Sequence, residues 1–198
     1  DVGGSFGMKG ALYSETPLSV WASQKHGRPV KWVSDRSEAF MTDAHGRDHV
    51  TKAEMGFDAD GNIVALQATT FANLGAYLST FAPAVPTYLH GTLMQGLYTT
   101  PKVNVDVTGM FTHTNAVDAY RGAGRPEATY LLERMLDLAA LEMGKDPAKL
   151  RLQNFIPPFD GVEEPGYQTQ VALQYDSGDY HAVLERALEM VGYEDFRK

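Results

Sequence analysis

Hydrophobic and polar residues alternate along the middle of the chain, as they do in half-buried strands. The runs at 50–57 (VTKAEMGF) and 63–72 (IVALQATTFA) flank the turn-forming stretch 58–62 (DADGN), so this pattern predicts a β-hairpin. A similar alternation over 103–111 predicts a further strand, and the run 29–33 (PVKWV) predicts a short one. Strands are therefore expected mainly in the first half of the chain.

Helical periodicity dominates the second half of the chain. The run 126–143 starts with a proline, carries apolar residues at helical spacing and is closed by Gly144. A shorter helix is expected over 146–154, with an aspartate as its N-cap and a proline behind it. A last amphipathic helix is expected to follow a cap at 176–178 and to end at Gly192.

The remaining segments are expected to be loops and short helices. A helix with Thr16 as its N-cap and Gly27 as its stop signal is predicted near the N-terminus, and 35–40 predicts one helical turn. Residues 45–49 are predicted to be a loop, and 73–100 a long functional loop with short helical pieces. Strands first and helices later predict an α+β fold, with a mixed or antiparallel sheet and packed helices.

Length and composition fit a globular chain. The 198 residues suit one domain or one and a half, and contents of 43% hydrophobic and 21% charged residues argue against disorder. The net charge of -8 disfavours a surface for nucleic acid or anionic membranes, and no apolar run approaches the roughly 20 residues that span a bilayer. No cysteine is present, which excludes disulfides and thiolate metal sites within the chain. The chain begins with Asp1 and no signal-peptide pattern, so we expect either that its start was removed or that it is cut from a longer protein.

Two glycine-rich loops carry the candidate chemistry. The first, at 3–10 (GGSFGMKG), lets backbone N–H groups approach a ligand, but it matches neither a dinucleotide fingerprint nor a P-loop. The second, at 119–128 (AYRGAGRPEA), combines two glycines, Arg121, Arg125 and the start of a helix. These features suit an anionic cofactor. On residue chemistry alone, ordinary turns and a helix cap remain the alternative interpretation for both loops.

Three other polar clusters favour structural roles. Two histidines four positions apart in 45–49 could bind a metal on a helix, but Gly46 favours a loop. The 58–62 stretch resembles the start of a calcium loop, yet Thr69 stands where such a loop needs an acidic residue. The 176–178 stretch has no partners for a catalytic triad visible in the sequence and is better explained as a helix cap.

Taken together and in this order, these loops resemble the molybdenum-binding large subunit of the xanthine dehydrogenase, aldehyde oxidase and aerobic carbon monoxide dehydrogenase family. GGSFGMKG resembles the family's Gly-Gly-Gly-Phe-Gly loop. Further blocks follow in the family's order, at 27–40, 45–49, 72–83 and 150–158. The resemblance covers essentially the whole chain and is greatest to the glycine-loop (form II) variant of the carbon monoxide dehydrogenase large subunit.

This resemblance implies a domain assignment and a cofactor. Residues 1–198 would be a single fragment of a molybdopterin-binding domain, with 1–125 mainly strands and cofactor loops and 126–198 mainly helical. Both glycine-rich loops would hold the molybdenum cofactor. The positions that match are Gly4, Phe6 and Gly7 in the first loop and Arg121, Gly122, Ala123 and Gly124 in the second. Arg47 matches, across a gap, an arginine that places substrate in purine-oxidising members.

Departures from the family pattern narrow the expected substrate. Gly122 stands where copper-containing carbon monoxide dehydrogenases carry the cysteine that binds copper, so carbon monoxide is not the expected substrate. Gly10 and Ala123 stand where purine oxidisers have a glutamate and a phenylalanine, so xanthine is not expected either. An aldehyde or an N-heterocycle is the better match to the resulting open pocket.

The resemblance also implies what the chain lacks. The family's general base is a glutamate in a Gly-x-Gly-Glu stretch, which does not occur here, so no catalytic residue is expected in this chain. The full enzyme would hydroxylate substrate with oxygen from water and pass electrons to iron–sulfur and FAD-containing partner subunits, in the cytoplasm. We expect the isolated chain to be inactive and to hold no stoichiometric molybdenum. A non-catalytic pterin-binding protein and a purely structural domain are the alternatives.

Overall fold

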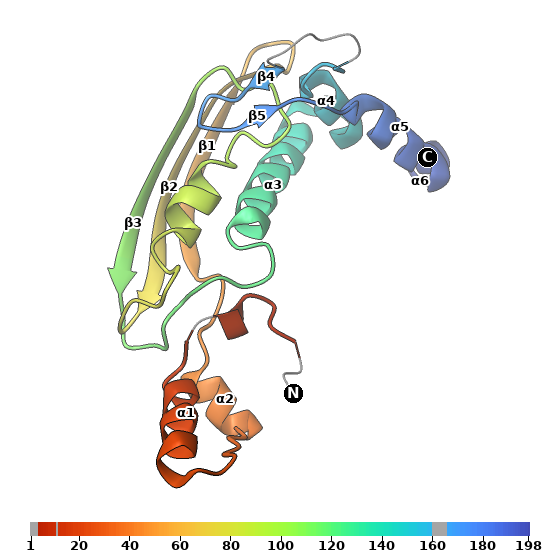
Figure 1. Cartoon of the computed structure of the whole chain (residues 1–198). Helices are drawn as coiled ribbons and strands as arrows, with labels where there is room; N and C mark the ends of the chain where they lie inside the picture. The colour runs from red at the N-terminus through yellow and green to blue at the C-terminus, as the bar shows by residue number, and fades with distance from the viewer. Residues whose placement is uncertain (1–3, 11, 160–165) are drawn as a thin grey trace.

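A three-stranded mixed sheet forms the centre of the molecule (Figure 1). The computed structural model describes residues 4–10, 12–159 and 166–198. Strands β1 (His49–Phe57) and β2 (Ile63–Gly75) form an antiparallel hairpin, and β3 (Val103–Phe111) pairs in parallel with the other edge of β2. The predicted hairpin and the predicted strand at 103–111 are therefore confirmed.

The hairpin turn forms because one carboxylate organises it. Asp58 accepts hydrogen bonds from the backbone amides of Asp60, Gly61 and Asn62 at 2.8 to 3.0 Å, an arrangement in which the side chain replaces a backbone acceptor. Gly61 has a φ of 96°, which a residue with a side chain rarely adopts. The turn chemistry seen in the sequence thus has its expected structural role.

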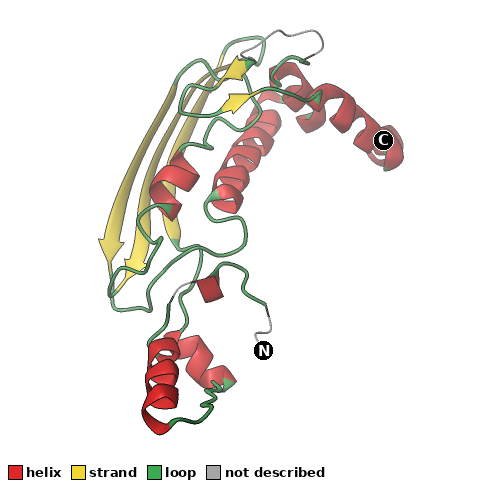
Figure 2. Cartoon of the chain, viewed as in Figure 1, coloured by secondary structure: helices red, strands yellow, loops and turns green. Residues whose placement is uncertain are grey.

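One face of the sheet is covered by helices (Figure 2). Helix α3 (Arg125–Met143) buries residues spaced four apart, and the short π-helix η2 (Val85–Leu89) lies on the same side of the sheet. The fully buried residues of α3 are Ala128, Leu132, Leu136 and Ala140. This spacing places them on one stripe of the helix. Helices packed on a mixed sheet confirm the predicted α+β class.

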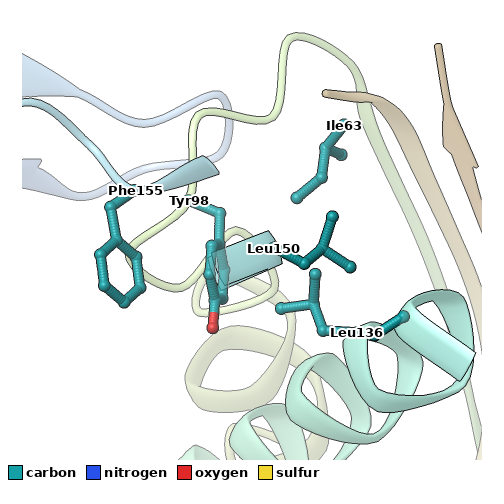
Figure 3. Close-up of a cluster of buried hydrophobic side chains, with 6 residues drawn as sticks. Ile63, Tyr98, Leu136, Leu150 and Phe155 are labelled. Atoms are coloured by element: carbon teal, nitrogen blue, oxygen red, sulfur yellow. The ribbon is translucent and has the colours of Figure 1, made fainter. Parts of the chain in front are cut away.

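The main core lies where α3 meets α4 (Pro147–Asn154) and the start of β2. Figure 3 shows Ile63, Leu136 and Leu150 converging there, with the rings of Tyr98 and Phe155 side by side next to them. The N-cap of α4 is Asp146, whose carboxylate accepts from two backbone amides, as its sequence predicts.

The C-terminal part adds small elements at the far end of the sheet. A two-stranded ribbon of β4 (Tyr167–Gln168) and β5 (Gln174–Tyr175) precedes helices α5 (Tyr180–Met190) and α6 (Tyr193–Phe196). The predicted last helix is confirmed, but its N-cap is Asp179 rather than a residue of 176–178. It also ends at Met190, before the predicted Gly192, which is instead the N-cap of α6. Asp179 caps because its carboxylate reaches the amide of Ala182 at 2.9 Å.

The N-terminal part forms a separate pair of helices below the sheet in Figure 1. The short 3-10 helix η1 (Met8–Gly10) precedes α1 (Glu15–His26) and α2 (Arg36–Thr42). A helix ending at Gly27 is confirmed, yet its N-cap is Ser14 and not Thr16. The helix predicted over 35–40 is also confirmed, because Asp35 and Glu38 form a reciprocal capping box.

Two further local predictions are corrected. The run 29–33 forms no strand, since no neighbouring strand offers it backbone partners, and Val30, Trp32 and Val33 are exposed. The predicted 45–49 loop ends one residue early because His49 opens β1. Among the described residues, no helix is long and apolar enough to cross a membrane.

Candidate functional site

Three loops from distant parts of the chain meet at the lower end of the sheet. The backbone amide of Arg121 donates to the carbonyl of Phe6 at 2.8 Å, and the rings of Phe6 and Tyr120 stack with centroids 6.2 Å apart. The start of the 45–48 loop pairs with the segment before Ala119. The amide of His45 donates to the carbonyl of Ala116, and the amide of Asp118 donates to the carbonyl of His45. The structure therefore brings together the 4–10, 45–48 and 119–125 loops.

Arg47 ties the second loop to the third. Its guanidinium donates from Nη2 to the carbonyl of Tyr120 at 3.2 Å and to the carbonyl of Arg121. The same group lies over the ring of Tyr120, 5.3 Å from the centroid. Its Nε lies 3.9 Å from a carboxylate oxygen of Glu127, in the first turn of α3. One arginine thus contacts both the loop and the helix that follows it.

Backbone strain is concentrated in the same three loops. Among the described residues, three non-glycine positions have a positive φ: Phe6 at 52°, Arg47 at 60° and Ala123 at 40°. Each such residue costs on the order of 1–3 kcal/mol and persists only where its surroundings fix it. Each of the three loops contributes one of these residues, which marks the junction as a functional candidate.

Close backbone approach explains several of the glycines. A Cβ on Gly7 would lie 2.8 Å from the carbonyl oxygen of Ala119, and one on Gly46 would lie 2.5 Å from the Cβ of Tyr120. A Cβ on Gly124 would lie 2.7 Å from the backbone nitrogen of His90. Any side chain at these positions would push the loops apart. The glycines of the sequence motif therefore serve packing as well as conformation.

Backbone donors remain available at this junction. In the described part of the chain, the amides of Gly7, Gly122 and Gly124 have no hydrogen-bond acceptor. Gly7 and Gly122 are exposed, whereas Gly124 is buried against Leu89 and His90. The amide of Ala123 donates to Tyr120, and that of Arg125 donates to Gly122. A glycine-rich loop with free amides that leads into a 19-residue helix has the features of an anion site.

The local charge is also suitable for an anion. The chain as a whole carries a net charge of -8. Around this junction, however, Arg36, Arg121 and Arg125 form no ion pair with a described residue. Two of the acidic residues close by have a basic neighbour, since Asp43 pairs with Lys9 at 2.8 Å and Glu127 lies beside Arg47. Asp118 forms no ion pair with a described residue and is held by backbone amides. Unpaired guanidinium groups next to free amides favour an anionic ligand.

A pocket of about 350 Å³ opens beside the junction. It is bounded by α2 on one side and by the 45–47 segment and Tyr120 on the other. Its lining includes Met8, Phe40, Arg47 and Tyr120. A volume of this size suits a small organic molecule.

A buried polar layer lies behind the 119–125 loop. His49 of β1 and His90, just after η2, have their rings 5.0 Å apart, and His90 is 1% exposed. Burial lowers the pKa of His90 to about 4, and the neighbouring His49 adds to this effect. Burial also lowers the pKa of His49, against the opposing influence of the Glu127 carboxylate. Both imidazoles are therefore neutral near pH 7.

The positions singled out in the sequence fall on this junction with one exception. Gly4, Phe6, Gly7, Arg47 and the 121–124 stretch lie in the three meeting loops. Gly10 instead ends η1, and a Cβ there would meet no atom within 4 Å.

Two acidic residues of the junction escaped the sequence reasoning. Asp118 is 5% exposed, and its carboxylate accepts from the amides of Ala119 and Phe81 at 2.5 and 3.1 Å. It holds the start of the 119–125 loop against the 76–84 segment. Glu127 lay inside the motif, and its place in the first turn of a predicted helix was an available signal. Asp118 had no such signal, because only the fold brings Phe81 to it.

A known protein family matches the part of the chain that contains this junction. The model of the molybdopterin cofactor-binding domain family matches residues 1–155 of the chain. This match includes all three loops of the junction and the whole of α3 and α4. The chain belongs to the molybdopterin cofactor-binding domain family.

Individual relatives support the same family assignment. The carbon monoxide dehydrogenase large chain of Hydrogenophaga pseudoflava is 38% identical over 202 residues, covering 100% of this chain and 24% of the relative. Subunit gamma of the 6-hydroxypseudooxynicotine dehydrogenase complex of Paenarthrobacter nicotinovorans is 34% identical, covering 99% and 25%. The structure of quinoline 2-oxidoreductase from Pseudomonas putida 86 matches with a TM-score of 0.91 at 30% identity, covering 100% and 25%. The chain spans about a quarter of the length of these relatives.

Proposed function

We propose that this chain forms part of the molybdenum-cofactor-binding catalytic subunit of a hydroxylase similar to carbon monoxide dehydrogenase and aldehyde oxidase. The observation that carries this proposal is the set of unpaired amides at Gly7, Gly122 and Gly124, in two loops joined by the bond from Arg121 to Phe6. The family match covers the same loops. A phosphate-bearing cofactor offers the acceptors that these donors lack.

Several residues of the two glycine-rich loops would bind the molybdenum cofactor. The amides of Gly7, Gly122 and Gly124 would donate to it, and the neighbouring Gly4 and Phe6 would shape the first loop. Arg121 would supply positive charge, and Ala123, with its φ of 40°, would keep the second loop in its tight turn. When bound, the molybdenum cofactor supplies the redox chemistry that inserts an oxygen atom from water into substrate.

The expected substrate is an aldehyde or an N-heterocycle. The chain contains no cysteine, so it cannot supply the copper-binding residue of copper-containing carbon monoxide dehydrogenases. The pocket of about 350 Å³ beside the junction has room for a small aromatic ring. One similar protein, quinoline 2-oxidoreductase, is named for an N-heterocycle. Arg47 lies at the edge of this pocket, where the family resemblance implies a contact to substrate.

The proposed enzyme needs more than this chain. We propose that residues 1–198 are one fragment of the cofactor-binding domain, and that the rest of the large subunit supplies the general-base glutamate. Iron–sulfur and FAD-containing partner subunits would accept the electrons, and the complex would work in the cytoplasm. Two of the similar proteins are named as a large chain and as a complex subunit, which supports a multi-subunit assembly.

Replacing Arg121 tests the proposed cofactor role. In the complete protein that contains this chain, Arg121→Ala is expected to lower the molybdenum and pterin retained per protein about tenfold or more. A charge-assisted hydrogen bond contributes about 1.5–3 kcal/mol, which corresponds to such a factor. Elemental analysis and pterin fluorescence after release would measure the loss. The matched control is Arg134→Ala, an exposed arginine on α3 that should keep the wild-type content.

Three outcomes separate the candidate functions. Unchanged cofactor retention in Arg121→Ala would contradict the role of this loop. A wild-type protein that holds pterin but oxidises neither an aldehyde nor an N-heterocycle would favour a non-catalytic binding protein. A wild-type protein that holds no pterin would leave the structural domain as the better description.

A further inference from the structure

The contacts of Arg47 and Glu127 carry an inference about how the 119–125 loop is oriented. We infer that these two residues are positioning residues: Arg47 fixes the peptide that aims the amide of Gly122 at the cofactor, and Glu127 fixes Arg47. This inference rests on the proposed function, because it assumes that the loop faces a cofactor. It differs from the substrate contact that the family resemblance implies for Arg47.

The geometry of a trans peptide connects Arg47 to the Gly122 amide. A peptide unit is planar, and its carbonyl and N–H point in opposite directions. Arg47 donates to the carbonyl of Arg121, which belongs to the same peptide unit as the N–H of Gly122. Holding this carbonyl on one side therefore aims the N–H of Gly122 away from Arg47. That N–H has no acceptor among the described residues.

The preceding peptide is held from both sides. The carbonyl of Tyr120 accepts from Arg47 Nη2 at 3.2 Å and from the amide of Ala123 at 2.8 Å. The N–H of Arg121, in the same peptide unit, donates to the carbonyl of Phe6 at 2.8 Å. Two successive peptide planes are thus fixed. The Tyr120–Arg121 peptide is held by Arg47, Ala123 and Phe6, and the Arg121–Gly122 peptide is held by Arg47 alone. Only the second of them depends wholly on Arg47.

Several contacts hold Arg47 itself in place. Its φ of 60° is a strained conformation, and the absence of a Cβ at Gly46 lets Tyr120 approach the chain beside it. Its guanidinium lies over the Tyr120 ring. Planar stacking and a forked set of donors are properties that a lysine lacks. The site therefore uses arginine for its shape as well as its charge.

Glu127 supplies the opposing charge from the first turn of α3. Its side chain is 10% exposed, and its Oε2 lies 3.9 Å from Arg47 Nε without any hydrogen-bond partner among the described residues. A buried carboxylate is stable only beside a compensating charge. His49 and His90 face the same region and are neutral near pH 7. Arg47 is therefore the cation that balances Glu127, and each residue keeps the other in position.

The test compares two conservative variants in the complete protein with its partner subunits. Arg47→Lys keeps the charge but removes the forked donors, and Glu127→Gln keeps the size but removes the charge. We expect the cofactor content of each variant to fall about tenfold. This lies within the roughly 10- to 100-fold range seen when a residue that orients the ligating groups is replaced. Matched controls are Arg134→Lys and Glu142→Gln, which change exposed residues of α3 and should retain cofactor normally.

Two further readouts distinguish positioning from other roles. Hydrogen exchange at the amides of Arg121 and Ala123 should become faster in both variants, while exchange in β1 and β2 stays unchanged if the fold is intact. In the fraction that still holds cofactor, KM for substrate should stay within twofold of the wild-type value. Unchanged cofactor content with a raised KM would overturn the inference and assign Arg47 to substrate.

The proposed function and this inference fail in different ways. If the wild-type protein holds no pterin, the proposed function fails, whatever the variants do. Faster exchange at Arg121 and Ala123 in the variants would still support the positioning pair in that case. If the wild-type protein holds pterin and neither variant changes retention or exchange, the positioning inference alone is overturned.

Discussion

At the scale of single residues, the junction is unusual for the backbone conformations that it maintains. Phe6, Arg47 and Ala123 all have positive φ values although none is glycine. Such conformations need external support, which comes here from stacking between Phe6 and Tyr120 and from the contacts of Arg47. Strained residues held by contacts across three loops give a preorganised surface for a ligand.

The residue scale is also where sequence reasoning was least complete. It selected Gly7, Gly122 and Gly124 because closely spaced glycines indicate a backbone that approaches a ligand or another segment. It could not anticipate that the Asp118 carboxylate accepts from the amide of Phe81, or that the rings of His49 and His90 are in contact. Those contacts join residues from separate elements, and no local pattern records them.

The buried His90 gives a prediction about pH and stability. Its folded pKa of about 4 lies below the ordinary value of 6.5, so the unfolded state binds the proton more readily. Its neutral form therefore adds stability above pH 6.5, and this contribution is lost as the pH falls from 6.5 toward 4. The loss should reach at most about 3.5 kcal/mol, because the two pKa values differ by about 2.5 and each pKa unit corresponds to about 1.4 kcal/mol.

Urea unfolding of the wild-type protein at a series of pH values would measure this loss. The variant His90→Gln should remove most of it, because glutamine does not titrate in this range. The control is His113→Gln, at an exposed position, which should leave the pH dependence unchanged. An identical pH dependence in wild type and His90→Gln would contradict the assignment to His90.

At the scale of elements, the periodic segments were predictable and the unpaired ones were not. The hairpin, β3, α3 and α4 follow directly from alternation, helical spacing and caps. The 29–33 run carries the alternation of a strand, but strand formation depends on a neighbour that the fold does not supply there. The long 73–100 loop with its short helix η2 was anticipated from its composition.

The two ends of α3 give a matched pair of substitutions. Gly124 and Gly144 both have positive φ, at 86° and 64°. A Cβ on Gly124 would meet backbone atoms of Leu89 and His90 at 2.7 Å, whereas one on Gly144 would meet open space. Gly144→Ala should therefore cost only about 1 kcal/mol of unfolding free energy, the ordinary penalty for this conformation.

Gly124→Ala should cost about 3 kcal/mol or more, because backbone strain adds to a clash with backbone that cannot turn aside. Chemical denaturation of both variants would measure the difference. Equal losses at the two positions would mean that the 119–125 loop is not pressed against η2 in the way the structure has it.

At the scale of the whole molecule, the chain spans about a quarter of the length of the relatives named above and leaves much apolar surface uncovered. Val50 and Phe71, on the sheet, are 71% and 50% exposed, and Trp21 and Trp32 of the N-terminal part are also exposed. Exposed apolar surface on this scale indicates contact with other protein segments. The fold class and the family could be derived from the sequence, because the loop motifs keep a fixed order along the whole chain.

The isolated chain should therefore hold little cofactor. We expect molybdenum well below one equivalent in the purified 198-residue chain, since residues 4–7 and 121–122 of its loops are exposed and no other described segment encloses them. Elemental analysis of the isolated chain beside the complete protein would measure this. About one equivalent in the isolated chain would show that these loops alone suffice.

The junction of the three loops also has a consequence for the order of folding. Arg47 and Arg121 are 74 positions apart, whereas the β1–β2 turn closes over a few residues. Contacts between distant positions form late, because the entropy of closing a long loop is lost before the contacts stabilise the fold. During synthesis on the ribosome, the glycine loop at 4–10 emerges well before its partner at 119–125. The hairpin can therefore fold while the two halves of the junction are still separate, and the proposed cofactor site would be complete only after the start of α3 has left the exit tunnel.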